Sequence, residues 1–215
     1  MKYRRYKMKG KFITFEGCEG SGKSTQVALF REYLESNNID YIFTREPGGN
    51  QIAEKIRQII LDVNNSDMTD ECEALLYAAA RAQHISQTIL PALNEGKLVL
   101  CDRYIDSSFA YQAYARGLGL DFIKKVNSFA ISNCMPDYTV FLDISSTEAF
   151  KRKGGQDKDD RLEQVGLAFH EKVYEGYKKV IESDPSRFLV INCKGAKHET
   201  HQNIINALKE KKVLP

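Results

Sequence analysis

The chain has 215 residues, of which 42% are hydrophobic and 28% are charged, and its formal net charge is +2. These values are ordinary for a globular protein and exclude an intrinsically disordered chain, a collagen-like repeat and a disulfide-stapled miniprotein. No linker rich in proline, glycine or serine divides the sequence, so we expect one domain over residues 11–215.

The amino-terminal end carries the clearest charge asymmetry. Six lysines and arginines precede the first acidic residue, Glu16. Such an arm could contact nucleic acid, but short charged termini are more often solvated, and no arranged set of stacking aromatic residues follows. We therefore expect residues 1–10 to form a disordered basic arm, and we do not expect nucleic-acid binding.

Neither a membrane segment nor a disulfide framework is expected. The longest unbroken apolar run, at residues 74–80, has seven residues, whereas a helix needs about 20 to cross a bilayer. The five cysteines are odd in number and include no C-x-x-C pair, which favours a reducing compartment. These features predict a cytoplasmic protein.

Short apolar segments alternate with longer amphipathic ones along the chain. The apolar segments predict buried strands at residues 11–16, 39–45, 97–102, 138–143 and 187–192. Apolar positions at helical spacing predict helices at residues 25–36, 52–61, 74–87, 122–130 and 173–181. Strands that alternate with helices indicate a five-stranded, mostly parallel sheet with helices on both faces, a three-layer α/β sandwich.

Smaller signals refine the helices and loops. Thr69 and the acidic residues after it are typical of a helix start. Pro91 is expected to bend or end that helix, and Gly96 is expected to close the segment. Residues 151–163 hold five basic and four acidic residues and a Gly-Gly pair, so they predict a short mobile loop, or lid.

The strongest functional signal is the sequence G-x-x-x-x-G-K-S at residues 17–24, between a predicted strand and a predicted helix. In that context the glycines let backbone N–H groups surround phosphate oxygens, and the lysine reaches the β- and γ-phosphates. The sequence therefore predicts a P-loop NTPase fold that binds a nucleoside triphosphate. The residues expected at the phosphates are Gly17, Cys18, Glu19, Gly20, Ser21, Gly22, Lys23, Ser24 and Thr25.

A second signal lies at the end of the third predicted strand, where ligand sites of parallel sheets gather. Asp102 there can hold Mg²⁺ together with the Ser24 hydroxyl, and Arg103 can bind a phosphate. A switch GTPase would show D-x-x-G and N-K-x-D motifs, and neither occurs in this sequence.

Two further groups of residues suggest a second ligand. Residues 45–49 (REPGG) end the second strand, and Arg57 follows on the next helix, where spacing alone also allows a solvated arginine. Tyr77 and Arg81 are four residues apart and share a helix face, so they can stack on a base and bind its edge. A core tyrosine beside a surface arginine fits that spacing equally well. His84 is interpreted as a surface or capping residue.

Several motifs occur together in one order: FEG-x-EG-x-GKST, TREPGG, LLYAAARAQH, DRY-x-DSS-x-AYQ-x-YARG, PD-x-T-x-FLD and DRLE. Together they span about three quarters of the chain, and in this order they resemble the thymidylate kinase family of P-loop nucleoside-monophosphate kinases. The resemblance implies transfer of the ATP γ-phosphoryl group to dTMP, giving dTDP and ADP, with Mg²⁺ as cofactor. It also implies a homodimer formed through helices beside the nucleotide site.

The resemblance further implies roles at the acceptor sugar and phosphate. Glu19 would contact the 3′-hydroxyl, and Arg57 and Arg103 would hold the 5′-phosphate. The residues that would shape this part of the pocket are Arg45, Glu46 and Pro47.

At the base, the resemblance implies that Arg81 binds the thymine edge and that Ser108 and Gln112 reach the base. Tyr77 would stack on it; the family usually has Phe at this position. Tyr104 would crowd the 2′ position of the sugar and so favour deoxyribose.

The phosphate loop contains no arginine, which resembles the members of the family that supply a catalytic arginine from the lid. Arg152 and Arg161 are the candidates, with Lys153 and Lys158 behind them. Cys18 is expected to be a packing residue rather than a nucleophile. The predicted catalytic residues are Lys23, Asp102, Arg103, Arg152 and Arg161.

Two other functions fit part of these signals. A deoxynucleoside kinase shares the phosphate loop and would use Glu46 as the general base for a neutral 5′-hydroxyl. A nucleotide-dependent switch or binding module would bind ATP without transferring phosphate to any acceptor.

Overall fold

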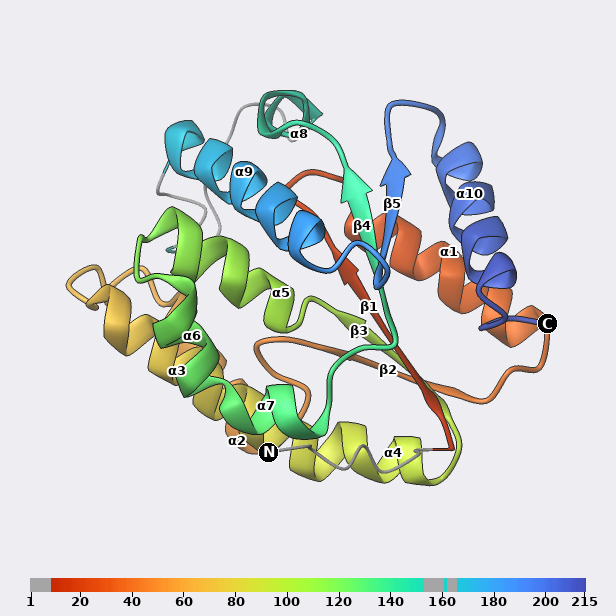
Figure 1. Cartoon of the computed structure of the whole chain (residues 1–215), viewed down its shortest axis with the longest axis horizontal. Helices are drawn as coiled ribbons and strands as arrows, with labels where there is room; N and C mark the ends of the chain where they lie inside the picture. The colour runs from red at the N-terminus through yellow and green to blue at the C-terminus, as the bar shows by residue number, and fades with distance from the viewer. Residues whose placement is uncertain (1–8, 153–160, 162–165) are drawn as a thin grey trace.

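The structure is a computed structural model that describes residues 9–152, 161 and 166–215 (Figure 1). Five strands form one parallel sheet in the order β2-β3-β1-β4-β5. The strands are β1 (Lys11–Glu16), β2 (Tyr41–Arg45), β3 (Leu98–Asp102), β4 (Tyr138–Asp143) and β5 (Phe188–Asn192). The predicted five-stranded α/β fold is therefore confirmed, with every strand parallel to its neighbours.

The strand starts differ from the predictions at three places for local reasons. Residues after α1 (Lys23–Ser36) form a turn in which Asn38 has φ 54° and Ile39 donates to the Leu34 carbonyl, so β2 begins only at Tyr41. Before β3, Lys97 donates its backbone N–H to the Ala92 carbonyl, so the strand begins at Leu98. Before β5, Arg187 donates its backbone N–H to Asp184 in a turn and therefore precedes the strand.

Helices cover both faces of the sheet (Figure 1). On one face α1 and α10 (Lys197–Glu210) lie side by side, and residues such as Phe30 and Leu208 pack with the strands in one buried core. The opposite core contains residues from several helices, such as Tyr177. The helices that contribute to it are α3 (Asp70–His84), α4 (Leu90–Asn94), α5 (Ile105–Ser108), α6 (Leu120–Val126), α7 (Ser128–Asn133) and α9 (Leu167–Ser183).

Two further helices complete the fold. Helix α2 (Gln51–Leu61) packs against α3. Helix α8 (Ser146–Arg152) follows β4 at its carboxyl end and adds Ala149 to the core that contains Phe30 and Leu208. The helix expected at residues 122–130 is broken at Asn127 into α6 and α7. None of the helices in the described part of the chain is long and apolar enough to span a membrane.

The segment after α3 departs from the prediction. Thr69 caps the helix as expected, because its side chain accepts from Cys72 N. Pro91 was expected to bend or end the helix, and it does not end it. A π-helical turn, η1 (Ile85–Ile89), and then α4 continue the helical backbone to Asn94. Pro91 lies in the first turn of α4, where its missing N–H is tolerated. A second π-helical segment, η2 (Phe109–Ala115), continues α5.

Candidate active site

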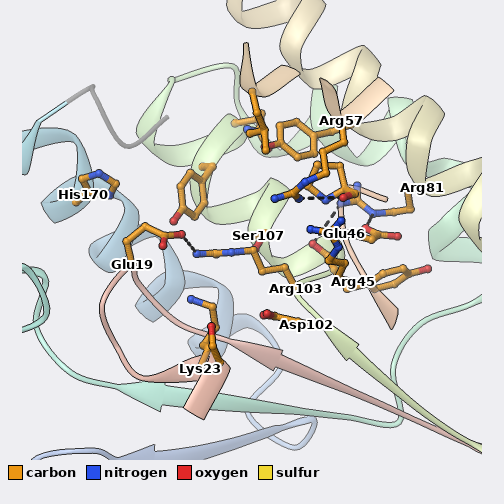
Figure 2. Close-up of a pocket in the computed structure, with 17 residues that line it drawn as sticks. Glu19, Lys23, Arg45, Glu46, Arg57, Arg81, Asp102, Arg103, Ser107 and His170 are labelled. Atoms are coloured by element: carbon orange, nitrogen blue, oxygen red, sulfur yellow. Dashed lines mark hydrogen bonds and ion pairs between the residues drawn. The ribbon is translucent and has the colours of Figure 1, made fainter. Parts of the chain in front are cut away.

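The carboxyl ends of the central strands meet at one edge of the sheet. The register places Asp102 of β3 opposite Phe15 of β1 and opposite Arg45 of β2. A cavity of about 320 Å³ opens at this edge and extends toward α2 and α3 (Figure 2). The sequence-predicted residues that line it are Glu19, Lys23, Ser24, Arg45, Glu46, Pro47, Arg57, Tyr77, Arg81, Asp102, Arg103, Tyr104 and Gln112.

At one end of the cavity the phosphate loop leads into α1, whose first residue is Lys23. The Lys23 ammonium donates to the carbonyls of Gly17 (3.0 Å) and Cys18 (3.1 Å), so the side chain folds back onto the start of the phosphate loop. Burial, together with the positive charge of Arg103, lowers the pKa of Lys23. Gly20 has φ 76°, and a Cβ there would collide with the carbonyl of Ala149, so the loop requires glycine at this point.

The other loop residues do not line the cavity; they are Gly17, Cys18, Gly20, Ser21, Gly22 and Thr25. Cys18 is 1% exposed, and burial raises the pKa of its thiol to about 12. The thiolate, which is the nucleophilic form, is therefore strongly disfavoured. This agrees with a packing role.

The donor set for a magnesium ion is present at the same end. Asp102 Oδ1 is buried and has no hydrogen-bond partner in the described part of the chain, and Ser24 lines the same cavity. A carboxylate and a hydroxyl, completed by phosphate oxygens and water, suit Mg²⁺. Among the described residues no cluster of three or more His, Cys, Asp or Glu could hold a metal alone, so the phosphates would have to supply ligands.

Arg103 lies between the two ends of the cavity (Figure 2). Its guanidinium pairs with Glu19 and donates to Ser107 Oγ (3.2 Å) and Tyr177 Oη (3.3 Å). Its φ is 64°, a left-handed backbone conformation that is uncommon outside glycine and is found at functional sites. These contacts fix the arginine before any ligand binds.

Glu16 lies beneath Arg103 at the end of β1 and was not predicted as a site residue. Its carboxyl accepts from Tyr104 N (2.8 Å), Ser107 Oγ (2.7 Å) and Tyr177 Oη (2.7 Å). Burial, reinforced by Asp106, raises the pKa of Glu16 to about 7, against opposing contributions that include Arg103. Glu16 thus positions the residues around Arg103 instead of facing the ligand.

At the other end of the cavity, the cations come from the last residue of β2 and from α2. Arg45 pairs with Glu54 of α2 at 3.0 Å, and Arg57 donates to the Pro47 carbonyl at 3.0 Å. Arg57 therefore reaches the cavity and is not a solvated arginine of a helix face. The Glu46-Pro47 peptide bond is cis. Gly49 has φ 85°, and a Cβ there would collide with the side chain of His84.

Arg81 is 2% exposed and forms the centre of a buried network. It donates to Glu46 (2.7 Å), Ser108 (3.0 Å), Asn127 (2.5 Å) and the Tyr104 carbonyl (3.2 Å). Four of the five N–H groups of a guanidinium are thereby engaged, which leaves one for a ligand in the cavity.

Two neighbours of Arg81 depart from the predictions. The interpretation of His84 as a surface or capping residue is wrong: it is fully buried, with Nδ1 3.0 Å from Glu46 and Nε2 2.6 Å from Thr44 Oγ1. Ser108 lies behind Arg81 and does not line the cavity, whereas Ser107 does.

Three other base-site candidates are placed around this network. Tyr77 and Gln112 line the cavity. Tyr104 also lines it, with its hydroxyl directed away to the Cys134 carbonyl (2.8 Å) and its ring packed edge-on against Phe12. Tyr111 and His170 line the cavity as well; nothing in the sequence pattern singled them out.

The two predicted lid arginines, Arg152 and Arg161, contact different parts of the molecule. Arg152 donates to the Cys193 carbonyl at 2.7 Å, next to the end of β5. Arg161 donates to the Ile60 carbonyl at 3.0 Å and pairs with Glu73 of α3. Lys153 and Lys158 lie outside the described residues, as do residues 1–8 of the basic arm.

Comparison with known proteins agrees with this geometry. A family model described as thymidylate kinase matches residues 15–204. Over 203 residues the chain is 50% identical to the thymidylate kinase of Finegoldia magna, covering 94% of this chain and 100% of that protein. It is 51% identical to the thymidylate kinase of Clostridium novyi, and that match covers 86% of this chain and 91% of that protein. It is 48% identical to the thymidylate kinase of Bacillus velezensis, and that match covers 94% of this chain and 97% of that protein.

A phosphate loop and a cation-lined acceptor pocket share one cavity, and the match extends over nearly the whole chain. The chain therefore belongs to the thymidylate kinase family.

Proposed function

We propose that this chain transfers the γ-phosphoryl group of ATP to the 5′-phosphate of dTMP, giving dTDP and ADP, at the cavity on the carboxyl edge of the sheet. One observation carries the proposal: a single cavity joins the phosphate-loop residues Lys23 and Ser24 to arginines from four other segments of the chain. The arginines on the acceptor side are Arg45, Arg57, Arg81 and Arg103. Such a set suits an acceptor that already carries a phosphate.

The donor end holds the ATP phosphates. Lys23 exchanges its backbone carbonyl contacts for the β- and γ-phosphates, and Ser24 and Asp102 hold Mg²⁺. A bound magnesium ion neutralises charge on the phosphates during transfer. Arg103, fixed by Glu19 and Ser107, lies where it can contact the transferred group.

The acceptor end needs no general base. The second pKa of a phosphate monoester is about 6, so the attacking oxygen is already anionic at neutral pH. Catalysis then consists of alignment and charge stabilisation, with the acceptor phosphate between Arg57 and Arg103 and the base between Tyr77 and Arg81.

The burial of Glu46 weighs against the deoxynucleoside kinase alternative. One of its carboxylate oxygens accepts from Arg81 and the other contacts His84, and the residue is 5% exposed. A general base must reach the proton that it removes, and both oxygens of this carboxylate are already held by Arg81 and His84.

An ADP-release assay tests the function directly. We expect turnover with dTMP that exceeds turnover with dUMP, ribo-TMP, dCMP, dGMP and thymidine. Higher activity with thymidine than with dTMP would indicate a deoxynucleoside kinase, and ATP binding without turnover of any acceptor would indicate a binding module. Either outcome contradicts the proposal.

We also propose that the lid supplies a catalytic cation. Arg152 and Arg161 flank this segment at its two ends, one near β5 and one near α3. Replacing either by Ala should lower kcat far more than it weakens nucleotide binding, measured as kcat against the Kd for ATP. Values of kcat equal to the wild type in both variants would contradict the assignment.

A cytoplasmic homodimer completes the proposal. Ile52 and Ile59 of α2 and Leu75 of the adjoining α3 are each about half exposed, which favours contact with a second copy. Sedimentation of the wild type should show a dimer. The variant Ile59→Glu should dissociate that dimer, whereas Val190→Glu, at an equally exposed position on β5, should leave it intact. A monomeric wild type at all concentrations would contradict the dimer.

A further inference from the structure

Glu73 is a buried carboxylate of α3 that the proposed reaction does not use directly. It is fully buried, yet it does not line the cavity. Three side chains from two segments converge on it: Gln112 of η2, Arg116 directly after η2, and Arg161. Figure 1 shows α3 beside the segment that joins α5 to α6, which is where η2 lies.

The two oxygens of Glu73 share Arg116 but differ in their shortest contacts. Oε2 accepts from Arg116 Nη2 at 3.0 Å and from Arg161. Oε1 accepts from the amide nitrogen of Gln112 at 2.9 Å and, at the longer distance of 3.4 Å, from Arg116 Nε. The guanidinium of Arg116 is held further by Asp70 at 3.2 Å and by the ring of Phe169. The carboxylate is thus anchored through Oε2, and Oε1 is presented to Gln112.

This contact determines which way the Gln112 amide faces. A carboxylate that is paired with two guanidinium groups offers acceptor oxygens, so the amide nitrogen turns toward it. Gln112 is 2% exposed and lines the cavity, so the amide oxygen is the atom left for a ligand. The cavity therefore presents an acceptor at Gln112 and a donor, the remaining N–H, at Arg81.

We propose that Glu73 is a positioning residue that sets the base preference by holding the Gln112 amide oxygen toward the acceptor base. Thymine carries an N–H at position 3 next to a carbonyl at position 4, which matches an acceptor beside a donor. Cytosine carries an unprotonated nitrogen at position 3 and an amino group at position 4, so both contacts would be mismatched. This inference rests on the proposed placement of the base beside Gln112 and Arg81.

Glu73→Gln reverses the orientation. The two arginines retain the new side-chain oxygen, so its amide nitrogen faces Gln112 and turns the Gln112 oxygen toward itself. The Gln112 nitrogen then faces the cavity, where it matches the unprotonated nitrogen at position 3 of cytosine and opposes the N–H at position 3 of thymine. We expect the ratio of kcat/KM for dTMP to kcat/KM for dCMP to fall by about tenfold or more, because a buried polar mismatch discriminates strongly.

A matched control and a rescue variant separate positioning from folding. Asp70→Asn removes another carboxylate that pairs with Arg116, but it does not touch Gln112, and should leave the ratio unchanged. The exchange Glu73→Gln with Gln112→Glu keeps a donor-to-acceptor pair between the two positions and again leaves an oxygen toward the cavity. It should restore the preference for dTMP, and it keeps the inference testable if Glu73→Gln alone fails to fold.

The outcomes separate this inference from the proposed function. If the wild type prefers dTMP and folded Glu73→Gln has the same ratio of kcat/KM for dTMP to kcat/KM for dCMP, the role of Glu73 is overturned and the proposed function stands. An equal fall in the ratio when Glu73→Gln is made in a Gln112→Ala background also overturns the role of Glu73, because the effect would then not pass through Gln112. A wild type inactive on dTMP overturns the proposed function itself.

Discussion

The two ends of the cavity are built differently. At the phosphate loop the ligand-facing groups, apart from Asp102 of β3, come from one stretch of about nine residues, and Lys23 donates to backbone carbonyls of that same stretch. At the acceptor end Arg81 and its partners Glu46, Ser108 and Asn127 come from four segments far apart in the sequence. The donor end is thus a local backbone structure, whereas the acceptor end is a buried side-chain network.

This contrast predicts different consequences for mutations. Groups that touch the transferred phosphate should affect rate with little effect on stability. Residues of the buried acceptor network should affect stability and acceptor binding together, because each one also satisfies a buried partner.

The largest expected effect is at Arg103, where the two ends meet. Arg103→Ala should lower kcat by about 10³-fold or more, the range found for arginines that stabilise phosphoryl transfer. The ADP-release assay with saturating dTMP and ATP measures this. Lys178→Ala removes an exposed lysine that pairs with Glu175 in an i,i+3 salt bridge and lies over the ring of Tyr174, and it should leave kcat unchanged. A loss below tenfold would show that Arg103 does not act in the transition state.

Arg81 and Arg45 test the buried network against an exposed pair. Arg81→Ala leaves Glu46 buried with only His84 and should lower the free energy of unfolding by about 3–5 kcal/mol. Arg45→Ala breaks the salt bridge between Arg45 and Glu54, whose side chains are 45% and 38% exposed. It should lower the free energy of unfolding by at most about 1 kcal/mol. Both should weaken dTMP binding. Denaturant unfolding of the two variants measures the difference, and similar losses would remove the contrast.

Glu16 gives a pH test of the region beneath Arg103. Burial raises the pKa of Glu16 in the folded chain from its ordinary value of 4.5 to about 7, so the folded state binds the proton more tightly. The contribution to stability is complete below pH 4.5 and is lost as the pH rises through 7, by about 3 kcal/mol. Glu16→Gln should remove this component from unfolding curves measured between pH 4.5 and 8. Glu182→Gln, at an exposed position on α9, should not.

The smallest expected effect concerns the hydroxyl of Tyr77. Stacking on a base depends on the ring, and it is worth about 1–3 kcal/mol. Tyr77→Ala should therefore raise the KM for dTMP by about tenfold or more, whereas Tyr77→Phe should change it by less than about threefold. Equal changes in both variants would show that the hydroxyl, and not the ring, contacts the acceptor.

The sequence predicted the local parts of this molecule and not the long-range parts. Five strands and the phosphate loop were recognisable because apolar runs and glycine spacing are encoded within a few residues. The roles of His84, Glu73 and Asn127 were not, because each depends on a partner at least 20 residues away. The π-helical turn before Pro91 was missed because it changes the hydrogen-bond pattern without changing the apolar spacing.

The cations that line the cavity also have a consequence for how ligands arrive. The protein as a whole is nearly neutral, so it attracts a polyanion only weakly from a distance. Within about a Debye length of the cavity, the clustered positive charge steers nucleotides inward and raises their rate of encounter. Association should slow steeply as ionic strength rises, while dissociation, which depends on short desolvated contacts, should change little.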